Sequence, residues 1–448
     1  MGVGWIVLAL GLSGEGGLPL RSMLGISSHV APDSAAARRE LDDEAILGIR
    51  WIRRDLPWHR VEPTPEEWRF GSWDELVGAM ESRGLGWVPL LAYGNPWAVR
   101  APSWCWPEPD HHFPPSDAAD FGEFAFRVAE RYGDRVDAFE VWNEPNVAGR
   151  FWKDCLWPAS RARPGQYVRL LRAAAAGIQR GAPGARVVFA GTYGPDTVVY
   201  PGTLRYLAEA YALDPDLGDH YDVMALHPYD RPLAWGPPEV DRPGAPSLTR
   251  FVGEVRGILA RWGDAQKPIW ITEHGFPSYR PGGVGELNQA RFLTRSLLLA
   301  ASLRIERYFV YTYEDGERAD TQETSFGLVG PPETGHRPKA SRRALATLLD
   351  VAGATAFWAD LTDSLALGSG ARVLEFRGSG RRVRAGWAWG REAPREARLP
   401  WAQGTRVLEV SMEGRERRAR SVGAEGELPV WLSASPKYWV SEGHGEGR

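Results

Sequence analysis

Eight short apolar runs of strand type alternate with amphipathic helical stretches between residues 24 and 351. The runs are 24–30, 51–58, 87–94, 138–145, 187–193, 222–229, 268–275 and 307–315. Between them, apolar residues recur at helix spacing from Phe121 to Tyr132, and a second helix is expected from Pro164 to Gly181. Eight strand–helix units in series predict an α/β fold, a closed (β/α)8 TIM barrel; a doubly wound open sheet is the alternative.

The pattern changes after residue 351. Strand-like stretches separated by glycine-containing turns follow, without a convincing helix. We therefore expect a barrel domain at residues 23–351 and a β-sandwich accessory domain at residues 352–448. This second domain is expected to cover barrel surface, with glycan binding and oligomerisation as alternatives, and the sequence leaves the oligomeric state open.

The N-terminal segment and the two cysteines give information on the cellular compartment of the protein. Residues 5–12 are apolar but too short for a membrane span, which needs about 20 residues. Residues 1–22 fit a leader or signal segment only in part, because no basic residue precedes the run; a true start at Met23 is the alternative. A disulfide between Cys105 and Cys155 would favour an oxidising compartment, and two unpaired loop thiols are the alternative. Secreted and cytoplasmic locations are thus equally compatible with the sequence.

Composition narrows the class of ligand. Lys and Arg total 53 against 57 Asp and Glu, a net charge of -4, so no basic surplus exists to neutralise a nucleic-acid backbone. The chain contains 21 Trp, many in Pro- and Gly-rich stretches. Flat apolar rings with a polar edge suit sugar rings. We expect an oligo- or polysaccharide as partner, no nucleic acid and no membrane span.

Two strand ends carry a carboxylate behind an apolar lead-in. The fourth run ends in Trp-Asn-Glu-Pro-Asn with Glu144, and the seventh in Ile-Thr-Glu-His-Gly with Glu273. The carboxyl ends of barrel strands build the active site, so these side chains are expected to face each other across the barrel mouth. Glycosidic bond cleavage requires such a pair, one protonated and one ionised. For either Glu alone, a structural salt bridge is the alternative.

These motifs resemble a known group of enzymes. WNEPN and WITEHG are similar to the acid/base and nucleophile strands of clan A glycoside hydrolases, which are retaining enzymes on (β/α)8 barrels. Residues 48–58, 143–152 and 183–193 resemble family 39 of that clan, which includes β-xylosidases, α-L-iduronidases and bacterial exopolysaccharide endoglycosidases. The resemblance covers about residues 24–351, and the paired motifs are specific to the clan more than to the family.

The resemblance implies roles for residues around the catalytic pair. Glu144 is the implied general acid/base and Glu273 the implied nucleophile. Asn143 is implied to hold the sugar 2-hydroxyl. Arg53 is implied to keep the nucleophile ionised, with Arg50 and Arg54 as nearby alternatives.

The resemblance extends to three further strand ends. On the sixth strand, Tyr229 is implied to hydrogen-bond the nucleophile and His227 to support both carboxyl groups. At the end of the first strand, His29 is a candidate contact to a sugar hydroxyl. Many clan members place a Trp under the sugar on the eighth strand, where this chain has Tyr311 and Tyr313. Tyr311 is therefore the expected substrate contact there, and the identity of the sugar stays open.

Aromatic residues after the second, third and fourth strands are candidate stacking platforms for further sugars. We expect two or three of these to contact substrate, with Trp58 and Trp152 foremost; the full set is Trp58, Trp97, Trp104, Trp106, Trp152 and Trp157. The adjacent His111 and His112, with Asp110, lack metal-ligand spacing, so a structural or solvated role is expected. No metal and no cofactor is predicted.

The sequence as a whole predicts a retaining O-glycosyl hydrolase, a β-glycosidase or β-xylosidase, acting by double displacement. Three alternatives remain: an endo-acting enzyme on a bacterial exopolysaccharide or plant polysaccharide, a non-catalytic carbohydrate-binding barrel, and a metal-dependent hydrolase. The sugar, the linkage and exo or endo action are not determined by the sequence.

Overall fold

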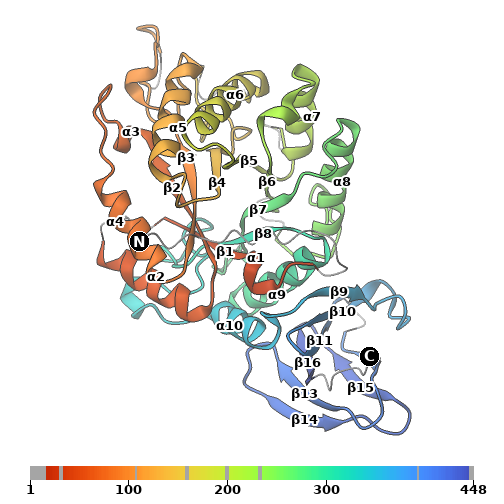
Figure 1. Ribbon diagram of the computed structural model, residues 1–448. Helices are drawn as coiled ribbons and strands as arrows, with labels where there is room; N and C mark the ends of the chain where they lie inside the picture. The colour runs from red at the N-terminus through yellow and green to blue at the C-terminus, as the bar shows by residue number, and fades with distance from the viewer. Residues whose placement is uncertain are drawn as a thin grey trace.

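The computed structural model describes residues 17–29, 34–105, 108–156, 161–196, 201–230, 235–390 and 393–442. Eight parallel strands close into a barrel in chain order, ringed by helices (Figure 1). The strands are β1 (Leu24–Ser28), β2 (Trp51–Pro57), β3 (Gly86–Ala92), β4 (Ala138–Asn143), β5 (Arg186–Tyr193), β6 (Met224–His227), β7 (Ile269–His274) and β8 (Arg307–Tyr311). Each coincides with a run expected from the sequence, so the predicted barrel is confirmed and the open sheet was the wrong alternative.

The helices fill the connections between strands. Their bounds are α1 (Leu20–Met23), α2 (Ala35–Leu47), α3 (Trp58–Val61), α4 (Gly71–Glu81), α5 (Ala118–Tyr132), α6 (Pro164–Gly181), α7 (Thr203–Leu213), α8 (Leu248–Arg261), α9 (Glu286–Ser302) and α10 (Ala340–Ala352). Short 3-10 turns lie at η1 (Pro96–Ala98), η2 (Leu217–His220), η3 (Pro332–Thr334) and η4 (Gly368–Gly370). Helices α5 and α6 pack closely, because a β-carbon on Gly177 would lie 2.1 Å from the Gly122 carbonyl oxygen.

The segment expected as a leader is partly folded into the barrel domain. Leu20 in α1 is buried, and its amide donates to the Thr355 carbonyl at 2.9 Å, while the Arg21 amide donates to the Gly353 carbonyl. The boundary expected at residue 22 therefore falls inside packed structure. Residues 1–16 lie outside the described part of the chain.

Side-chain alternation along the strands builds two layers inside the barrel. The lower layer is apolar and consists of Val88, Ala138, Val188, Val223, Ala225, Trp270 and Phe309. Because the period of a strand is two residues, the next inward position on β4, β6 and β7 belongs to Glu140, His227 and Thr272. The barrel interior is thus apolar below and polar directly under its mouth.

The C-terminal domain is antiparallel, as the sequence predicts, and forms a β-sandwich. A six-stranded sheet runs in the order β14-β13-β16-β11-β10-β9 and a two-stranded sheet pairs β12 with β15. The strands are β9 (Ala356–Asp360), β10 (Ala371–Gly378), β11 (Arg381–Ala388), β12 (Arg395–Pro400), β13 (Arg406–Ser411), β14 (Arg417–Ser421), β15 (Glu427–Leu432) and β16 (Lys437–Glu442). The indole of Trp387 donates to Glu239 at 2.7 Å, which ties this domain to the barrel.

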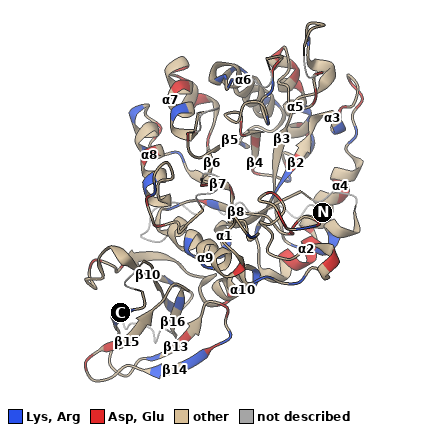
Figure 2. Ribbon diagram, turned by 180° about the vertical axis from the view of Figure 1, so that it is seen from behind, with Lys and Arg blue, Asp and Glu red and all other residues tan. Residues whose placement is uncertain are grey.

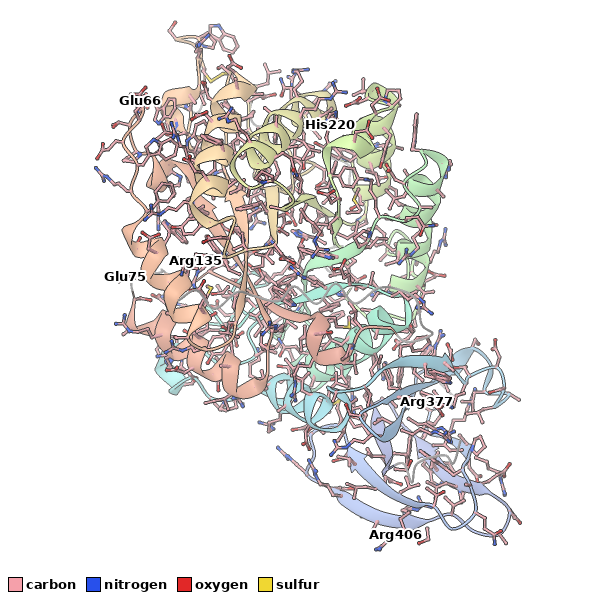
Figure 3. The ribbon with its side chains drawn as sticks, in the orientation of Figure 1. Glu66, Glu75, Arg135, His220, Arg377 and Arg406 are labelled. Atoms are coloured by element: carbon pink, nitrogen blue, oxygen red, sulfur yellow. A yellow bond between two sulfur atoms is a disulfide. The ribbon has the colours of Figure 1, made fainter. Side chains whose placement is uncertain are left out.

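Basic side chains gather on β14 at the outer edge of the C-terminal domain (Figure 2), and Arg406 of β13 lies at the same end (Figure 3). Several of them meet acids: Arg417 pairs with Asp350 at 2.7 Å and Arg420 with Glu409 at 2.9 Å. Within the described residues, no helix is both long and apolar enough to cross a membrane.

Candidate active site

The two predicted carboxylates lie at the barrel mouth. Glu144 directly follows β4 and Glu273 is near the end of β7, and they are 6% and 8% exposed. Trp142 and Glu144 have positive φ angles of 69° and 44°, a region that costs a non-glycine residue about 1–3 kcal/mol. The Glu144 amide donates to the Gly191 carbonyl on β5 at 2.9 Å. The sheet therefore holds this carboxylate on a strained turn, which is typical of functional sites.

Glu144, Glu273 and His227 converge on one point. One oxygen or nitrogen atom from each side chain lies within 4.8 Å of the other two. His227 ends β6 and is fully buried. The structure therefore brings together the three residues that the sequence placed on separate strands.

Glu273 sits among donors that stabilise a carboxylate. The Arg53 guanidinium donates through Nη1 to Oε1 at 2.6 Å, and the Tyr229 hydroxyl donates to Oε2 at 3.2 Å. Burial raises the pKa of the Tyr229 phenol well above its ordinary value, so this hydroxyl keeps its proton and remains a donor. Glu273 therefore accepts from one positively charged donor and one neutral donor.

Glu144 has the opposite surroundings. Burial raises the pKa of its carboxyl group from 4.5 to about 8, against the opposing effect of the Arg150 and Arg53 charges. The nearby Glu323 adds to the rise. At neutral pH the Glu144 carboxyl group therefore carries a proton. The site thus pairs the protonated Glu144 with Glu273, a carboxyl group that accepts from an arginine.

Arg53 organises the floor of the site. It is completely buried and donates to Glu140 through Nε at 2.5 Å and Nη2 at 3.2 Å. Nη2 also donates to the Asn143 side-chain oxygen at 2.9 Å, which orients that amide. Within the described residues, the Asn143 side-chain nitrogen has no protein acceptor, so it is available to a sugar hydroxyl. The sequence left Arg50 and Arg54 as alternatives to Arg53 for the arginine next to Glu273.

Within the described residues, neither alternative arginine contacts Glu273. The Arg50 guanidinium donates to the Gly84 carbonyl at 2.8 Å on the exposed side. Arg54 is buried, and its pKa is lowered by burial against the charges of Glu40 and Glu44. Only Arg53 among the three contacts Glu273.

Two buried residues of this site, Glu140 and Thr272, were not predicted from the sequence. Glu140 on β4 accepts hydrogen bonds from Arg53, from the Gly191 amide at 3.1 Å and from the Thr272 hydroxyl at 3.0 Å. Each lies two residues beyond an inward apolar side chain, Ala138 or Trp270. That period of two was the available signal, since a polar residue in an inward register must find partners inside the barrel.

A cavity of about 250 Å³ opens at the ends of β1, β2 and β3, and its lining includes neither Glu144 nor Glu273. Its lining includes Ser28, His29, Asp55, Tyr93 and His111. The exposed His29 ring meets Tyr311 edge-on with centroids 5.3 Å apart, and Tyr311 likewise meets Tyr229 at 6.2 Å. Aromatic contacts thus connect the cavity to Tyr229, which donates to Glu273, and both His29 and Tyr311 stay candidates for substrate contact.

Trp58 and Trp152 are not surface platforms, which corrects the sequence expectation. They are 0% and 1% exposed. Trp58 packs against Trp97 and Phe124 at centroid distances of 5.3 and 5.5 Å, and Trp152 packs against Trp142 at 5.0 Å. These rings fill the aromatic layer behind the strands, because burying a large ring against others gains more than leaving it at the rim.

The remaining platform candidates differ in exposure. Trp97 is half-buried, and its indole donates to the Glu62 carbonyl at 3.1 Å. Trp104 is 66% exposed and could meet an extended ligand. Trp106 and Trp157 lie outside the described residues.

Glu144, His227 and Glu273 are also close enough to satisfy the spatial requirement for a metal site, which the sequence did not predict. Their present contacts do not favour a cation. The Arg53 charge lies 2.6 Å from Glu273, and a hydrogen bond of 2.8 Å already joins His227 to Glu144. We therefore assign no metal to this group.

The histidine pair after β3 has structural contacts. The ring of His111 stacks on His59 with centroids 4.5 Å apart, and the amide of His112 donates to Asp110 at 2.8 Å. Burial lowers the pKa of His112 to about 4, so the ring is neutral at neutral pH. These contacts agree with the expected structural role.

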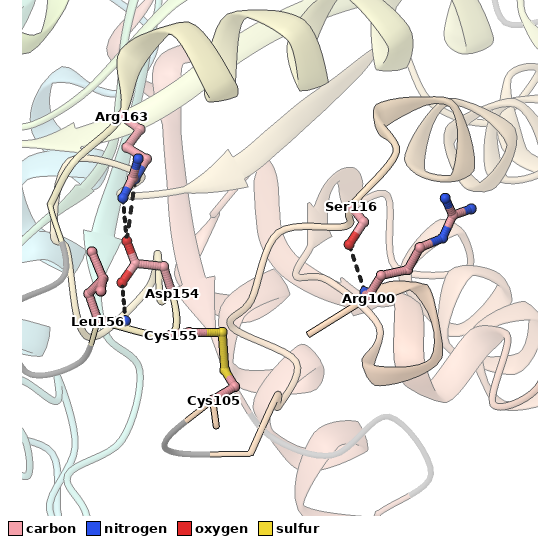
Figure 4. The surroundings of a disulfide bond; sticks show 7 residues. All are labelled: Arg100, Cys105, Ser116, Asp154, Cys155, Leu156 and Arg163. Carbon is pink, nitrogen blue, oxygen red and sulfur yellow. Dashed lines mark hydrogen bonds and ion pairs between the residues drawn. A yellow bond between two sulfur atoms is a disulfide. The ribbon is translucent and has the colours of Figure 1, made fainter. Parts of the chain in front are cut away.

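A disulfide bond joins Cys105 to Cys155 (Figure 4). It connects the loop after β3 to the loop after β4. Beside it, Arg163 pairs with Asp154 at 3.0 Å. Of the two alternatives that the sequence left open, the structure has the bonded one.

No family model and no curated protein matches this sequence. Solved structures do match its fold. A family 39 glycoside hydrolase from Bacteroides cellulosilyticus WH2 has a TM-score of 0.72 and 22% identity, covering 95% of this chain and 82% of that chain. A monomeric β-xylosidase from Caulobacter crescentus CB15 has a TM-score of 0.66 and 16% identity, covering 96% and 98%. A family 30 endoxylanase from Clostridium papyrosolvens C71 has a TM-score of 0.61 and 12% identity, covering 96% and 98%.

These likenesses extend over both domains. The chain has the fold of clan A glycoside hydrolases, with family 39 and family 30 enzymes among its structural neighbours.

Proposed function

We propose that this protein is a retaining glycoside hydrolase in which Glu144 is the general acid/base and Glu273 the nucleophile. The observation that carries the proposal is the buried pair of unlike acids within 4.8 Å of one another. Double displacement uses carboxyl groups about 5–5.5 Å apart, whereas inversion needs about 6.5–9.5 Å to admit a water molecule. Oxygen atoms of the two groups within 4.8 Å of each other favour the shorter class and hence retention.

The proposed reaction has two steps. In the first, a Glu273 oxygen attacks the anomeric carbon while the Glu144 proton passes to the departing glycosidic oxygen. A sugar–Glu273 ester remains. In the second, ionised Glu144 takes a proton from water, and the water oxygen attacks the anomeric carbon and releases Glu273. Asn143 would hold the sugar 2-hydroxyl during both steps, since Arg53 fixes its orientation.

We favour a β-glycosidase or β-xylosidase over an endo-acting enzyme, because a monomeric β-xylosidase is among the structures of similar fold. The cavity of about 250 Å³ at the ends of β1, β2 and β3 is lined by neither Glu144 nor Glu273, so it is not assigned to the reacting sugar. The structural neighbours named β-xylosidase and endoxylanase are consistent with a xylose-type sugar.

Hydrolysis of a panel of aryl β-glycosides and xylo-, gluco- and galacto-oligosaccharides tests the proposal. Glu273→Ala should abolish turnover, and azide should restore it while giving a glycosyl azide of inverted configuration. Glu130→Ala, a change at an exposed acid on α5, is the matched control and should keep full activity. Near-normal turnover by Glu273→Ala would refute the assignment.

The same panel separates the alternatives. Saccharide binding without turnover would identify a non-catalytic carbohydrate-binding barrel. Activity lost to a chelator and restored by a divalent ion would identify a metal-dependent hydrolase, contrary to our assignment.

A further inference from the structure

Four buried side chains form a continuous line of hydrogen bonds beneath the barrel mouth. The Glu144 Oε1 atom lies 2.8 Å from His227 Nδ1, and His227 Nε2 lies 3.0 Å from the Thr272 hydroxyl. That hydroxyl lies 3.0 Å from Glu140 Oε1. The line crosses the barrel from β4 through β6 and β7 back to β4.

The contacts of Glu140, at one end of the line, determine which group donates in each hydrogen bond. Glu140 accepts from the Arg53 guanidinium and the Gly191 amide, groups that can only donate, so it is held as an acceptor. The Thr272 hydroxyl therefore gives its single proton to Glu140. Since that proton is used, the Thr272 oxygen can only accept from the His227 ring.

This order fixes the proton on the histidine. His227 must carry its proton on Nε2, which leaves Nδ1 as a bare acceptor. Burial lowers the pKa of His227 to about 4, so the ring is neutral and cannot protonate both nitrogens at neutral pH. The hydrogen bond of 2.8 Å between Nδ1 and Glu144 can then be formed only by a proton on Glu144.

The packing around the line is tight at Gly191. A β-carbon on Gly191 would lie 2.0 Å from His227 Nε2 and 2.6 Å from the Thr272 hydroxyl oxygen. Position 191 therefore has to be glycine for the ring and the hydroxyl to meet. His227 and Thr272 are both 0% exposed, so water cannot replace either partner without displacement.

We infer that Glu140 and Thr272 are positioning residues that fix His227 in the Nε2-protonated tautomer and thereby hold Glu144 as the protonated acid. The catalytic meaning of this inference rests on the proposed function; the tautomer itself does not. The same geometry helps the second step. Once Glu144 has lost its proton, it faces the Nδ1 lone pair, and this repulsion favours recovery of a proton from water.

Other charged groups face the two titrating side chains. Arg150, Arg53 and Glu323 act on Glu144, the two arginines favouring its ionised form and Glu323 opposing it. Charges that face His227 come from Glu273, whose Oε2 lies 3.9 Å from Nδ1, and again from Arg53 and Glu140. Within the described residues, none of these groups forms a hydrogen bond with either His227 Nδ1 or Glu144 Oε1.

The test is the tautomer of His227 in the full-length protein, measured by long-range ¹H–¹⁵N NMR on histidine-labelled chain. The nine histidines can be assigned by difference with His227→Gln. We expect a bare Nδ1 in the wild type and in Thr272→Ser, which keeps the hydroxyl. In Thr272→Val, which keeps the shape but lacks the hydroxyl, a population protonated on Nδ1 should appear.

The kinetic counterpart is the alkaline limb of the kcat/KM profile. Thr272→Val should move this limb down by about one pH unit, a tenfold loss at high pH, and Thr272→Ser should restore it. A wild-type His227 protonated on Nδ1, or an unmoved limb in folded Thr272→Val, would overturn the inference. The NMR readout needs no substrate: the expected tautomer without hydrolysis would refute the proposed function alone, whereas an active enzyme with the wrong tautomer would refute the line of hydrogen bonds alone.

Discussion

Replacing Glu144 with Gln should abolish acid catalysis and stabilise the fold. In the folded protein burial raises the pKa of this carboxyl group from 4.5 to about 8. At pH 7 the unfolded chain therefore carries the ionised form and the folded chain the protonated form, so folding has to take up a proton. Stability provided by this group is complete below pH 4.5 and is lost as pH rises toward 8.

The loss of stability at pH 7 follows from the interval between pH 4.5 and pH 7. Each pH unit between 4.5 and 7 removes about 1.4 kcal/mol, which gives about 3 kcal/mol at pH 7. Gln does not titrate, and its amide nitrogen can donate to His227 as the protonated acid does. For a barrel domain of roughly 330 residues, 3 kcal/mol corresponds to a melting temperature about 4 °C higher for Glu144→Gln.

Differential scanning calorimetry of both proteins from pH 4.5 to 9 measures this effect. The gap in melting temperature should be smallest near pH 4.5, widen to pH 8 and then stay constant. Glu130→Gln, at an exposed position, should follow the wild type throughout. Parallel curves for Glu144→Gln and the wild type at every pH would show that folding does not raise the pKa of Glu144, and the assignment of the acid would then lose its physical basis.

Three further predictions concern activity and stability. Because Glu144 must be protonated, kcat/KM should fall about tenfold between pH 7 and pH 9, and a profile flat over this range would contradict that requirement. Trp58→Ala and Trp152→Ala should each lower the unfolding free energy by about 3–5 kcal/mol in denaturant titrations, while KM of the folded fraction stays unchanged. A raised KM with unchanged stability would instead show that these side chains contact substrate. Cys105→Ser with Cys155→Ser, which opens a loop of 50 residues, should cost about 4 kcal/mol by the same measurement, and no change would mean that the two loops are held by other contacts.

Much of the architecture could be predicted because it depends on local patterns. The strand and helix periods from residue 24 to 351 favour the barrel over an open sheet, and in a barrel a carboxylate after an apolar strand lies at the mouth. Glu144 and Glu273 were found in this way, and the structure brings them together. The positions of Arg53, Asn143 and Tyr229 came from resemblance, and each now has a contact that accounts for its place.

The platform tryptophans show where a local pattern fails. An aromatic ring after a strand can face substrate or fold back into the core, and the residues around it in sequence are the same in both cases. Trp58 and Trp152 fold back because the rings of neighbouring helices and loops surround them. Such contacts join segments distant in sequence, so no window of sequence contains them.

The sequence alone determined which residues have the chemistry to act, because acid and donor groups are properties of single side chains. Tertiary structure decided which of two similar acids keeps its proton. That choice depends on burial and on an ordered line from Glu140 through Thr272 and His227, three residues from three strands. A pKa is set by the charges and hydrogen bonds that surround a group in space, and these exist only once the barrel has closed.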